Sequence, residues 1–259
     1  MRLKFNKEIE FFFKKYLLPK SFLLKKRIER SIKNADENEI KLIKDLIKPG
    51  TDSIDVGVYR GVYSYEMSKY SKTVHSFEPN PVIFDDIDKN LKKIIKNMVL
   101  YNFALSNENK TFILRVPIRN NKINKKNYEE YYEMGRATIH EKNIMSNCEN
   151  FKINSKKIDD LNLNNEISFI KIDVEGHELE VIDGAKKTIE KNKPKLLVEI
   201  EEKHTQKKVS DSIKYINSLG YNSFFLKNDV LKDTSKIEDY DLNNNYIFIP
   251  KKNLWSKLY

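Results

Sequence analysis

The sequence predicts an α/β protein with a mostly parallel sheet and helices on both faces. Apolar runs typical of buried strands alternate along the chain with segments whose apolar residues recur at helical spacing. Three of the predicted strands end in an acid, at Asp55, Glu78 and Asp173. Because the carboxyl ends of parallel strands meet at one edge of a sheet, we expect these carboxylates to lie along one ligand crevice.

Strands and helices alternate through the first part of the chain. The predicted elements are a helix over 35–47, a strand ending at Asp55, a helix over 61–70, a strand over 73–78, a helix over 83–94 and strands over 98–102 and 111–116. Pro49-Gly50 ends the first helix, since neither residue favours a helix interior. The first two strands are each followed by a helix, as parallel connections require.

Residues 117–150 interrupt this alternation with a polar, tyrosine-rich insertion that contains His140. Long connections in compact domains are usually functional or disordered. One hypothesis is that His140 and the tyrosines line an acceptor site, and the other is that Tyr128, Tyr131 and Tyr132 pack on the domain.

Alternation of strands and helices resumes after the insertion, with strands over 167–173, 195–200, 221–226 and 246–249 and helices over 178–191 and 206–219.

Composition fits a globular protein with a heavily charged surface, at 39% hydrophobic and 33% charged residues. The net charge of +10 raises the question of an acidic partner, but lysine is abundant along almost the whole chain, and we favour this general composition as the explanation over a dedicated site for a polyanion. The single Cys148 excludes an internal disulfide and a cysteine-based zinc site. No apolar run reaches the roughly 20 residues of a spanning helix, and no signal-peptide pattern is present, so we expect a cytoplasmic protein.

Residues 1–35 form a basic, aromatic-rich N-terminal arm, and 36–259 form the α/β domain with its insertion at about 117–150. Pro19 divides the arm into two short amphipathic helices. Such helices suit an anionic membrane surface, here the inner membrane face. Their aromatic clusters equally suit packing on the domain or on a second subunit of a homo-oligomer.

The turn after the first strand, Gly57-Val58-Tyr59-Arg60-Gly61, and the acid that follows at Glu78 favour a nucleoside-bearing ligand. Glu78 comes 21 positions after Gly57, close to the spacing at which an acid accepts hydrogen bonds from a ribose. A strand-end acid also serves as a helix N-cap, but three together weaken that explanation. The turn lacks the second glycine that cradles a pyrophosphate, and Asp55 would repel one. The cationic S-adenosylmethionine tolerates that acid, so it is favoured over NAD.

At this point the chain resembles FkbM-type methyltransferases. The resemblance is carried by Asp55-Val56-Gly57-x-x-x-Gly61-x-Tyr63-Ser64, Phe77-Glu78-Pro79-Asn80-Pro81, Asn102-x-Ala104-Leu105-Ser106, Lys171-Ile172-Asp173-Val174-Glu175-Gly176-His177-Glu178 and Leu197-Val198-Glu199-Ile200. It spans about residues 50–205. It implies a class I methyltransferase (Rossmann-like) fold, with a seven-stranded sheet whose last strand is antiparallel. It also implies S-adenosylmethionine as the methyl donor and usually a hydroxyl as acceptor.

The resemblance also implies positions for the donor. Asp55, Gly57 and Gly61 would border its methionine part, Glu78 would bind the ribose, and Ala104 would lie near the adenine. Our own hypothesis is that Asp173 orients the acceptor or the donor amino group. The family commonly has a small residue and then Asn where this chain has Val58 and Tyr59. Tyr59 is therefore expected in the donor site, where its ring would narrow the pocket.

A hydroxyl acceptor must lose its proton, and a carboxylate or imidazole within hydrogen-bond reach serves as the base. Asp173, Glu175 and His177 lie together at the end of the predicted strand over 167–173 and are the catalytic candidates. We expect His177 or Asp173 to act as the base, against the alternative that His177 is a partly exposed residue at a helix start.

A second acidic cluster follows the next strand, and with Asp173 it offers oxygen ligands for Mg²⁺. It consists of Glu199, Glu201 and His204. An exposed acidic helix start explains Glu201 and Glu202 as well, and we favour that explanation over a metal.

The sequence therefore predicts a methyltransferase that modifies a hydroxyl on a sugar, glycan or glycolipid precursor. One alternative is a non-catalytic binding protein on the same scaffold, with the donor site closed by Tyr59. A nucleic-acid methyltransferase is disfavoured because the Asn/Asp-Pro-Pro-Tyr/Phe motif of base-amino methyltransferases is missing and the basic residues are dispersed.

Overall fold

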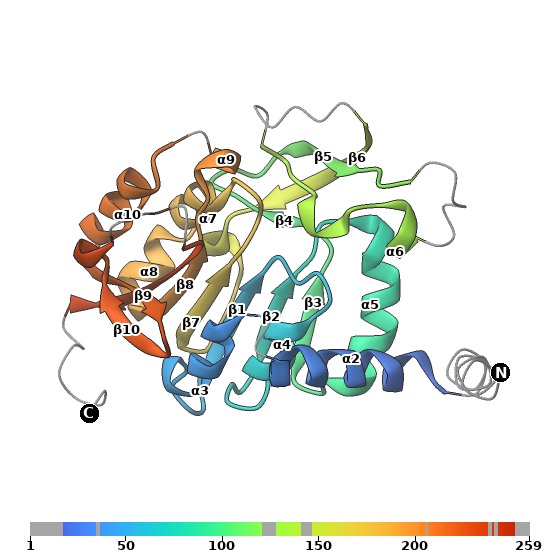
Figure 1. Cartoon of the computed structure of the whole chain (residues 1–259), viewed down its shortest axis with the longest axis horizontal. Helices are drawn as coiled ribbons and strands as arrows, with labels where there is room; N and C mark the ends of the chain where they lie inside the picture. The colour runs from blue at the N-terminus through green and yellow to red at the C-terminus, as the bar shows by residue number, and fades with distance from the viewer. Residues whose placement is uncertain are drawn as a thin grey trace.

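The computed structural model describes residues 18–34, 37–120, 128–140, 147–205, 207–237, 240 and 243–251 (Figure 1). The first helix predicted in the N-terminal arm falls on residues 1–17, outside the described residues, as do 121–127 and 141–146 of the insertion. Among the described residues, no helix has both the length and the apolar character needed to cross a membrane.

The main sheet has eight strands among the described residues, in the order β10-β9-β11-β8-β7-β1-β2-β3. These strands are β1 (Asp52–Val56), β2 (Val74–Phe77), β3 (Met98–Tyr101), β7 (Ile167–Ile172), β8 (Lys195–Glu199), β9 (Tyr221–Lys227), β10 (Val230–Asp233) and β11 (Asn245–Pro250). Strands β3, β2, β1, β7 and β8 are parallel to one another, whereas β11 runs antiparallel to both β8 and β9. The antiparallel last strand is confirmed. The expected number of seven is wrong, because β10 folds back on β9 as an added edge strand.

Helices cover both faces of this sheet, as predicted. They are α2 (Lys20–Asn34), α3 (Ile43–Leu46), α4 (Val62–Met67), α5 (Pro81–Ile94), α6 (Tyr128–Tyr131), α7 (Glu178–Asp183), α8 (Lys186–Asn192), α9 (Glu202–Thr205) and α10 (Val209–Ser218), with single 3-10 turns η1 (Asn38–Leu42), η2 (Met134–Arg136), η3 (Ile158–Asp160) and η4 (Thr234–Lys236).

The alternation of side chains along each central strand divides the core into two layers. Ile170 of β7 and Val198 of β8 face α7, α8 and α10, and their neighbours Phe169 and Leu197 face α3 and α4. All four are fully buried. Since successive residues of a strand point to opposite faces, a strand covered on both faces tends to be apolar along its length, as β7 is apart from Ser168 and Lys171. Lys171 is a charged residue inside such a strand, so it indicates that a buried carboxylate lies next to it.

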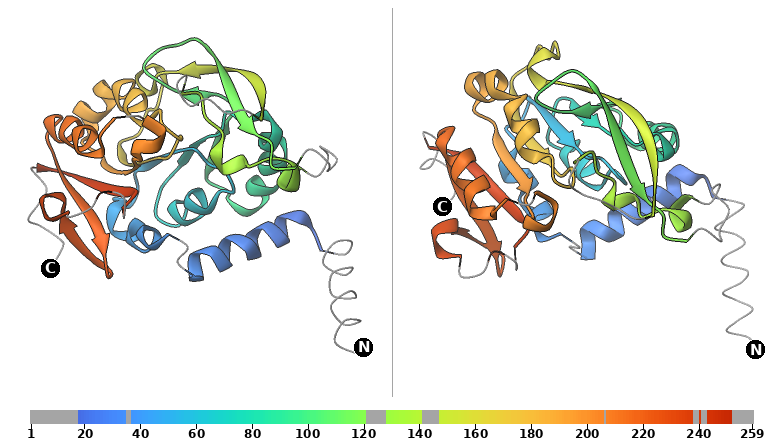
Figure 2. Two further views of the ribbon diagram at one scale, coloured as in Figure 1. Left: turned by 45° about the horizontal axis from the view of Figure 1, so that its top comes forward. Right: turned by 90° about the horizontal axis from the view of Figure 1, so that it is seen from above.

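Helix α2 packs on α5 and α4 and lies along one side of the molecule (Figures 1 and 2). Its Ile28 is buried with Ile87 and Leu91 of α5, while Phe22 remains 45% exposed among lysines. This half of the arm therefore contacts the domain. The contacts expected with a second subunit or a membrane surface stay predictions.

A second sheet of three strands lies apart from the main sheet, where Figure 2 shows β5 and β6 side by side. It contains β4 (Ala104–Leu105), β5 (Thr111–Pro117) and β6 (Cys148–Lys156), with β5 and β6 antiparallel over seven residue pairs. The predicted strand over 111–116 belongs here. The short β4 and the polar β6 gave no strong pattern and were missed.

Two predicted helices are interrupted. The helix expected over 178–191 is divided into α7 and α8 around Gly184, where a Cβ would lie 2.0 Å from the carbonyl oxygen of Ser106. The close approach of the β4 end displaces the chain at that point. The helix expected over 35–47 is, in its described part, the 3-10 turn η1 followed by one turn of α3.

Candidate functional site

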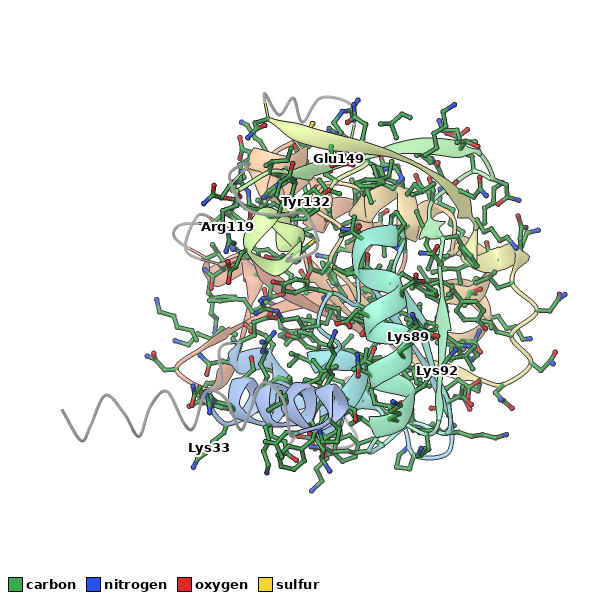
Figure 3. The ribbon with its side chains drawn as sticks, turned by 90° about the vertical axis from the view of Figure 1, so that its right-hand side faces the viewer. Lys33, Lys89, Lys92, Arg119, Tyr132 and Glu149 are labelled. Atoms are coloured by element: carbon green, nitrogen blue, oxygen red, sulfur yellow. The ribbon has the colours of Figure 1, made fainter. Side chains whose placement is uncertain are left out.

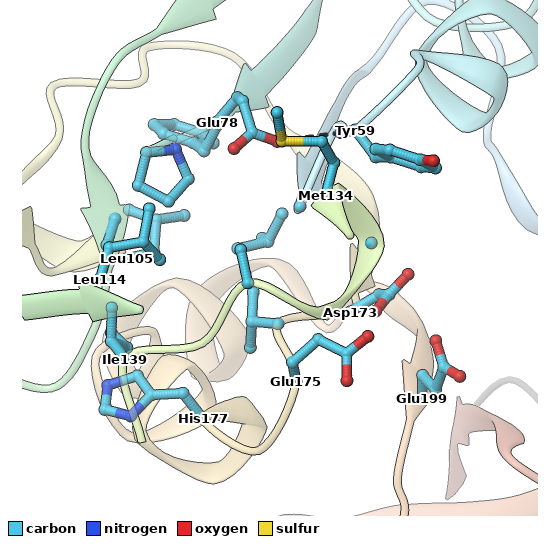
Figure 4. Close-up of a pocket in the computed structure, with 18 of the residues that line it drawn as sticks. Tyr59, Glu78, Leu105, Leu114, Met134, Ile139, Asp173, Glu175, His177 and Glu199 are labelled. Carbon is cyan, nitrogen blue, oxygen red and sulfur yellow. Dashed lines mark hydrogen bonds between the residues drawn. The ribbon is translucent and has the colours of Figure 1, made fainter. Parts of the chain in front are cut away.

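A pocket of about 260 Å³ lies beyond the carboxyl ends of β1, β2 and β7, and we call it the main pocket (Figure 4). Its lining includes the predicted residues Gly57, Tyr59, Glu78, Ala104, Asp173, Glu175 and His177. Asp55 and Gly61 are not among the lining residues. The structure thus brings together Glu78 and Asp173 from two strand ends, as the parallel arrangement predicts. The expectation that Asp55 lies along the same crevice is wrong.

The turn between β1 and α4 depends on its two glycines for different reasons. Gly57 has a φ of 89°, and a Cβ there would lie 1.9 Å from the carbonyl oxygen of Asp173. Gly57 therefore lets the turn approach the end of β7. Gly61 has a φ of 76°, and a Cβ would lie 2.6 Å from a methyl of Leu91. Its place is in the packing of α4 on α5, outside the pocket.

Glu78, at the end of β2, is held by two backbone donors. Its carboxylate accepts a hydrogen bond of 2.9 Å from the amide of Tyr59 and another of 2.9 Å from the amide of Asn80. Burial raises the pKa of Glu78 to about 7, although both hydrogen bonds act to lower it. The carboxylate is fixed in orientation and borders the pocket.

Asp55 is directed into the protein, where it forms part of a buried charge network. It is fully buried and accepts a hydrogen bond from the Ser64 hydroxyl. Burial raises its pKa to about 6, against the attraction of Lys171. The ammonium of Lys171 donates to Asp173 at 2.8 Å and lies over the Tyr63 ring, 4.8 Å from its centroid. Asp55 thus supports Asp173 through Lys171.

Asp173 is the ionised member of a carboxyl pair. Burial acts to raise its pKa, but the charge and hydrogen bond of Lys171 outweigh burial, and its pKa lies below the ordinary value. Glu199, at the end of β8, shares a hydrogen bond with Asp173, and burial together with the Asp173 charge raises the pKa of Glu199 to about 9. Glu199 is therefore protonated near neutral pH and donates to Asp173. Lys171 and Glu199 both belong to motifs found in the sequence, but the spacing of those motifs did not reveal that each side chain contacts Asp173.

Glu175 and Glu178 shape the turn after β7. Burial and the neighbouring carboxylates raise the pKa of Glu175 to about 8. Glu178 accepts hydrogen bonds from the amides of Val174 and Gly176, and burial raises its pKa to about 7. Glu175 has a φ of 56°, so the backbone of this turn is left-handed at Glu175.

His177 begins α7 and is only 6% exposed, so it is not the partly exposed residue of the alternative hypothesis. Its Nε2 lies 2.9 Å from the Ser106 hydroxyl and its Nδ1 lies 3.7 Å from a carboxylate oxygen of Glu180. Burial lowers its pKa to about 4, so the imidazole is neutral at neutral pH. In Figure 4 it lies beside Ile139, away from Asp173 and Glu199.

Tyr59 lies at the rim of the main pocket and leaves it open (Figure 4). Its ring is 38% exposed, and the guanidinium of Arg60 lies 4.9 Å from the ring centroid. Its backbone is left-handed, with a φ of 49°. This conformation is uncommon for residues other than glycine, and Asn adopts it more readily than Tyr does.

The opposite end of the main pocket is apolar. Phe77, Pro79, Phe103, Ala104 and Leu105 line it from the ends of β2, β3 and β4. The Phe77 and Phe103 ring centroids lie 5.4 Å apart. A flat apolar group fits this end, and the acids occupy the other.

The insertion closes over the pocket with residues other than those predicted. Met134, Gly135, Ala137 and Ile139 line the main pocket, and we call 134–139 the roof segment. The Thr138 hydroxyl anchors it by donating to the Glu175 carbonyl at 2.7 Å.

The aromatic residues named for an acceptor role lie elsewhere. Tyr131 and Tyr132 are buried against the three-stranded sheet, and the Tyr132 hydroxyl donates to Glu149 at 2.6 Å. Neither they nor His140 are among the lining residues of the main pocket. The side chain of Tyr128 lies outside the described part of the chain.

Among the acids considered for Mg²⁺, Glu201 is paired with a histidine. His204 Nε2 lies 2.7 Å from Glu201 and 3.1 Å from Glu175. Within the described ranges, no group of three or more His, Cys, Asp or Glu side chains has an arrangement that could hold a metal ion.

Comparison with known proteins gives a family match. The model of the methyltransferase FkbM domain matches residues 55–244 of this chain. A search of curated proteins finds no match.

Similar solved structures include methyltransferases of several kinds. One is a methyltransferase FkbM from Methylobacillus flagellatus KT, with a TM-score of 0.49 and 16% identity, covering 81% of this chain and 50% of that one. This chain thus spans half the length of that relative. An rRNA methylase from Streptococcus thermophilus has a TM-score of 0.46 and 9% identity, covering 83% of this chain and 95% of that one. A TehB-like SAM-dependent methyltransferase from Corynebacterium glutamicum has a TM-score of 0.43 and 12% identity, covering 89% of this chain and 98% of that one.

Proposed function

This chain belongs to the FkbM methyltransferase domain family, and we propose that it transfers the methyl group of S-adenosylmethionine to a hydroxyl of a sugar, glycan or glycolipid precursor. The observation that carries the proposal is the main pocket, which has an apolar end, a fixed carboxylate at Glu78 and an acidic end at Asp173. These three environments suit an adenine, a ribose and a positively charged amino-acid tail, in that order.

The residues present fit the donor. Ala104 and Phe103 would contact the adenine, and the Glu78 carboxylate would accept hydrogen bonds from the ribose hydroxyls. Gly57, which has no room for a Cβ, would leave backbone free to contact the tail. When bound, S-adenosylmethionine would supply a methyl group activated by its sulfonium. The role of the chain is to bind and orient both substrates and to accept the hydroxyl proton.

The ionisation states of Asp173, Glu175 and His177 indicate which of the three could accept the proton of the hydroxyl acceptor. Glu175, with a pKa of about 8, is largely protonated at neutral pH and is a poor base there. Asp173 is ionised, but it is engaged by Lys171 and Glu199. His177 is neutral, so its imidazole has a lone pair available to a hydroxyl that displaces Ser106. We therefore assign His177 as the base and Asp173 as the group that orients acceptor or donor.

A radiolabel transfer assay tests the reaction. The protein is incubated with S-adenosylmethionine carrying a labelled methyl group and a panel of sugars, nucleotide sugars and lipid-linked glycan precursors. The proposal expects label in at least one sugar as an alkali-stable ether, located by mass spectrometry. Label in RNA or DNA but in none of the sugars would contradict it.

A non-catalytic scaffold makes a different prediction in the same assay. In that case no acceptor would be labelled, and S-adenosylhomocysteine would not bind. The open main pocket beside Tyr59 favours the enzyme.

A further inference from the structure

A small groove lies next to the main pocket, on the face formed by α5 and α6. Its lining consists of Tyr59, Arg60, Ile83, Ile87, Arg119, Tyr132 and Met134, and we call it the arginine groove. Tyr59 and Met134 also line the main pocket, so the two spaces are neighbours. A molecule that reaches into the groove would therefore lie beside the donor site.

The floor of the groove is rigid and apolar. Ile83, Ile87, Tyr132 and Met134 are all buried to 7% exposure or less. The Tyr132 hydroxyl is engaged by Glu149. Figure 3 shows Tyr132 and Arg119 close together on this face.

The charge of the groove is opposite to that of the main pocket. Its lining contains Arg60 and Arg119 and, among the described residues, no aspartate or glutamate. Both arginines are exposed. Arg60 is positioned by the Tyr59 ring, over which its guanidinium lies at 4.9 Å. The main pocket, in contrast, is lined by Glu78, Asp173 and other carboxyl groups.

We propose that the arginine groove binds an anionic group, a phosphate or a carboxylate, on the sugar acceptor. Guanidinium groups bind both anions through paired charge-assisted hydrogen bonds. An anion held here would keep the remainder of the acceptor at the rim of the main pocket, and the acids of that pocket would repel the anion from the donor site. The acceptor is thus an acidic or phosphorylated sugar. This inference rests on the proposed methyltransferase function.

The test compares three probes with S-adenosylhomocysteine-saturated protein: glucose 1-phosphate, glucuronate and glucose, titrated to millimolar concentration at fixed ionic strength and followed by NMR. The expected result is binding of at least one anionic probe and weaker binding of glucose. The double substitution R60Q/R119Q should reduce anion affinity by about tenfold or more, equivalent to ~1.4 kcal/mol. The matched control K33Q/K89Q removes two exposed charges outside the groove and should leave affinity unchanged (Figure 3).

The two anionic probes distinguish a phosphate from a carboxylate as the anionic group of the acceptor. Preference for glucose 1-phosphate assigns a phosphorylated acceptor, and preference for glucuronate assigns an acidic sugar. The inference is overturned if neither anion binds better than glucose, if K33Q/K89Q loses as much affinity as R60Q/R119Q, or if single-stranded RNA competes far more strongly than either sugar. Failure of S-adenosylhomocysteine to bind would instead remove the proposed function itself.

Discussion

His177 is a buried imidazole whose pKa of about 4 keeps it neutral across the range in which the protein would work. If it is the base, H177Q should lower kcat by about 10²–10⁴-fold, the usual contribution of a general base. The affinity for S-adenosylhomocysteine should change little. Protonation below about pH 5 should lower kcat in the wild type, and this acid limb should be missing in H177Q.

The control for this prediction is H140Q, because His140 is not among the residues that line the main pocket. H140Q should keep wild-type turnover. Turnover of H177Q equal to that of the wild type would remove the base assignment and leave Asp173 as the candidate.

Lys171 is the second single residue with a testable role, because its ammonium offsets the negative charges of Asp55 and Asp173. The K171M substitution leaves the buried Asp55 and the half-buried Asp173 without their cation. Breaking a buried pair in this way costs about 3–5 kcal/mol, and urea unfolding at neutral pH should show a loss of this size. K48M, which removes one partner of the exposed Lys48–Glu166 pair, should cost about 1 kcal/mol or less. Equal, small losses in both variants would show that Lys171 is not essential to the network.

Sequence reasoning located much of the site at this scale, but not the direction of each side chain. The strand-end acids Asp55, Glu78 and Asp173 were found because a polar residue at the end of an apolar run is conspicuous. Whether each faces the ligand was not predictable. Asp55 lies inside the strand and points into the buried network, whereas Glu78 and Asp173 border the pocket. Lys171 could have been found as a lone charge in a buried strand.

At the scale of elements, the roof segment 134–139 contributes four residues to the lining of the main pocket. The Thr138 hydroxyl is buried and donates to the Glu175 carbonyl. T138V preserves the shape and removes that bond, together with the one that the hydroxyl accepts from the His140 amide, at a cost of about 1 kcal/mol each. The roof should loosen, and S-adenosylhomocysteine affinity should fall about fivefold through faster dissociation, as stopped-flow measurement would detect.

The matched control is T111V in β5 of the three-stranded sheet, where the threonine hydroxyl donates a hydrogen bond to the exposed side chain of Asn154. It should leave dissociation unchanged. If T138V also leaves it unchanged, the roof segment does not hold the ligand.

Strand pairing explains which elements were predictable. The central strands β1, β2, β7 and β8 are buried along almost their whole length, and all were predicted. The short β4, the polar β6 and the edge strand β10 are defined by their partners, not by their own pattern. The division between α7 and α8 depends on contact between Gly184 and Ser106, which lie 78 positions apart. Contacts of this kind leave no local signal.

At the scale of the whole molecule, the density of buried acids makes stability depend on pH. Burial raises the pKa above the ordinary value in five of them: Asp55 to about 6, Glu78 to about 7, Glu178 to about 7, Glu175 to about 8 and Glu199 to about 9. Between about pH 5 and pH 9 the folded protein therefore holds more protons than the unfolded chain, and stability falls as the pH rises. Asp173 has a lowered pKa, so its contribution is lost only at acidic pH.

We accordingly expect the melting temperature to be highest near pH 5 and to fall toward pH 9. Each kcal/mol lost lowers it by about 2–4 °C in a protein of this size. E199Q keeps the hydrogen-bond donor and removes the ionisation, so it should flatten the alkaline part of the decline. A melting temperature that rises from pH 5 to pH 9 would contradict the assigned ionisation states. Differential scanning calorimetry measures both variants.

The central claim is that the main pocket is a donor site, and calorimetric titration with S-adenosylhomocysteine tests it most directly. We predict one site per chain with micromolar affinity. E78Q should weaken binding by about tenfold or more, since a carboxylate is the stronger acceptor for ribose hydroxyls. E166Q, which changes an exposed acid far from the pocket, should bind as the wild type does. A folded wild-type protein that takes up no S-adenosylhomocysteine at millimolar concentration would contradict the claim.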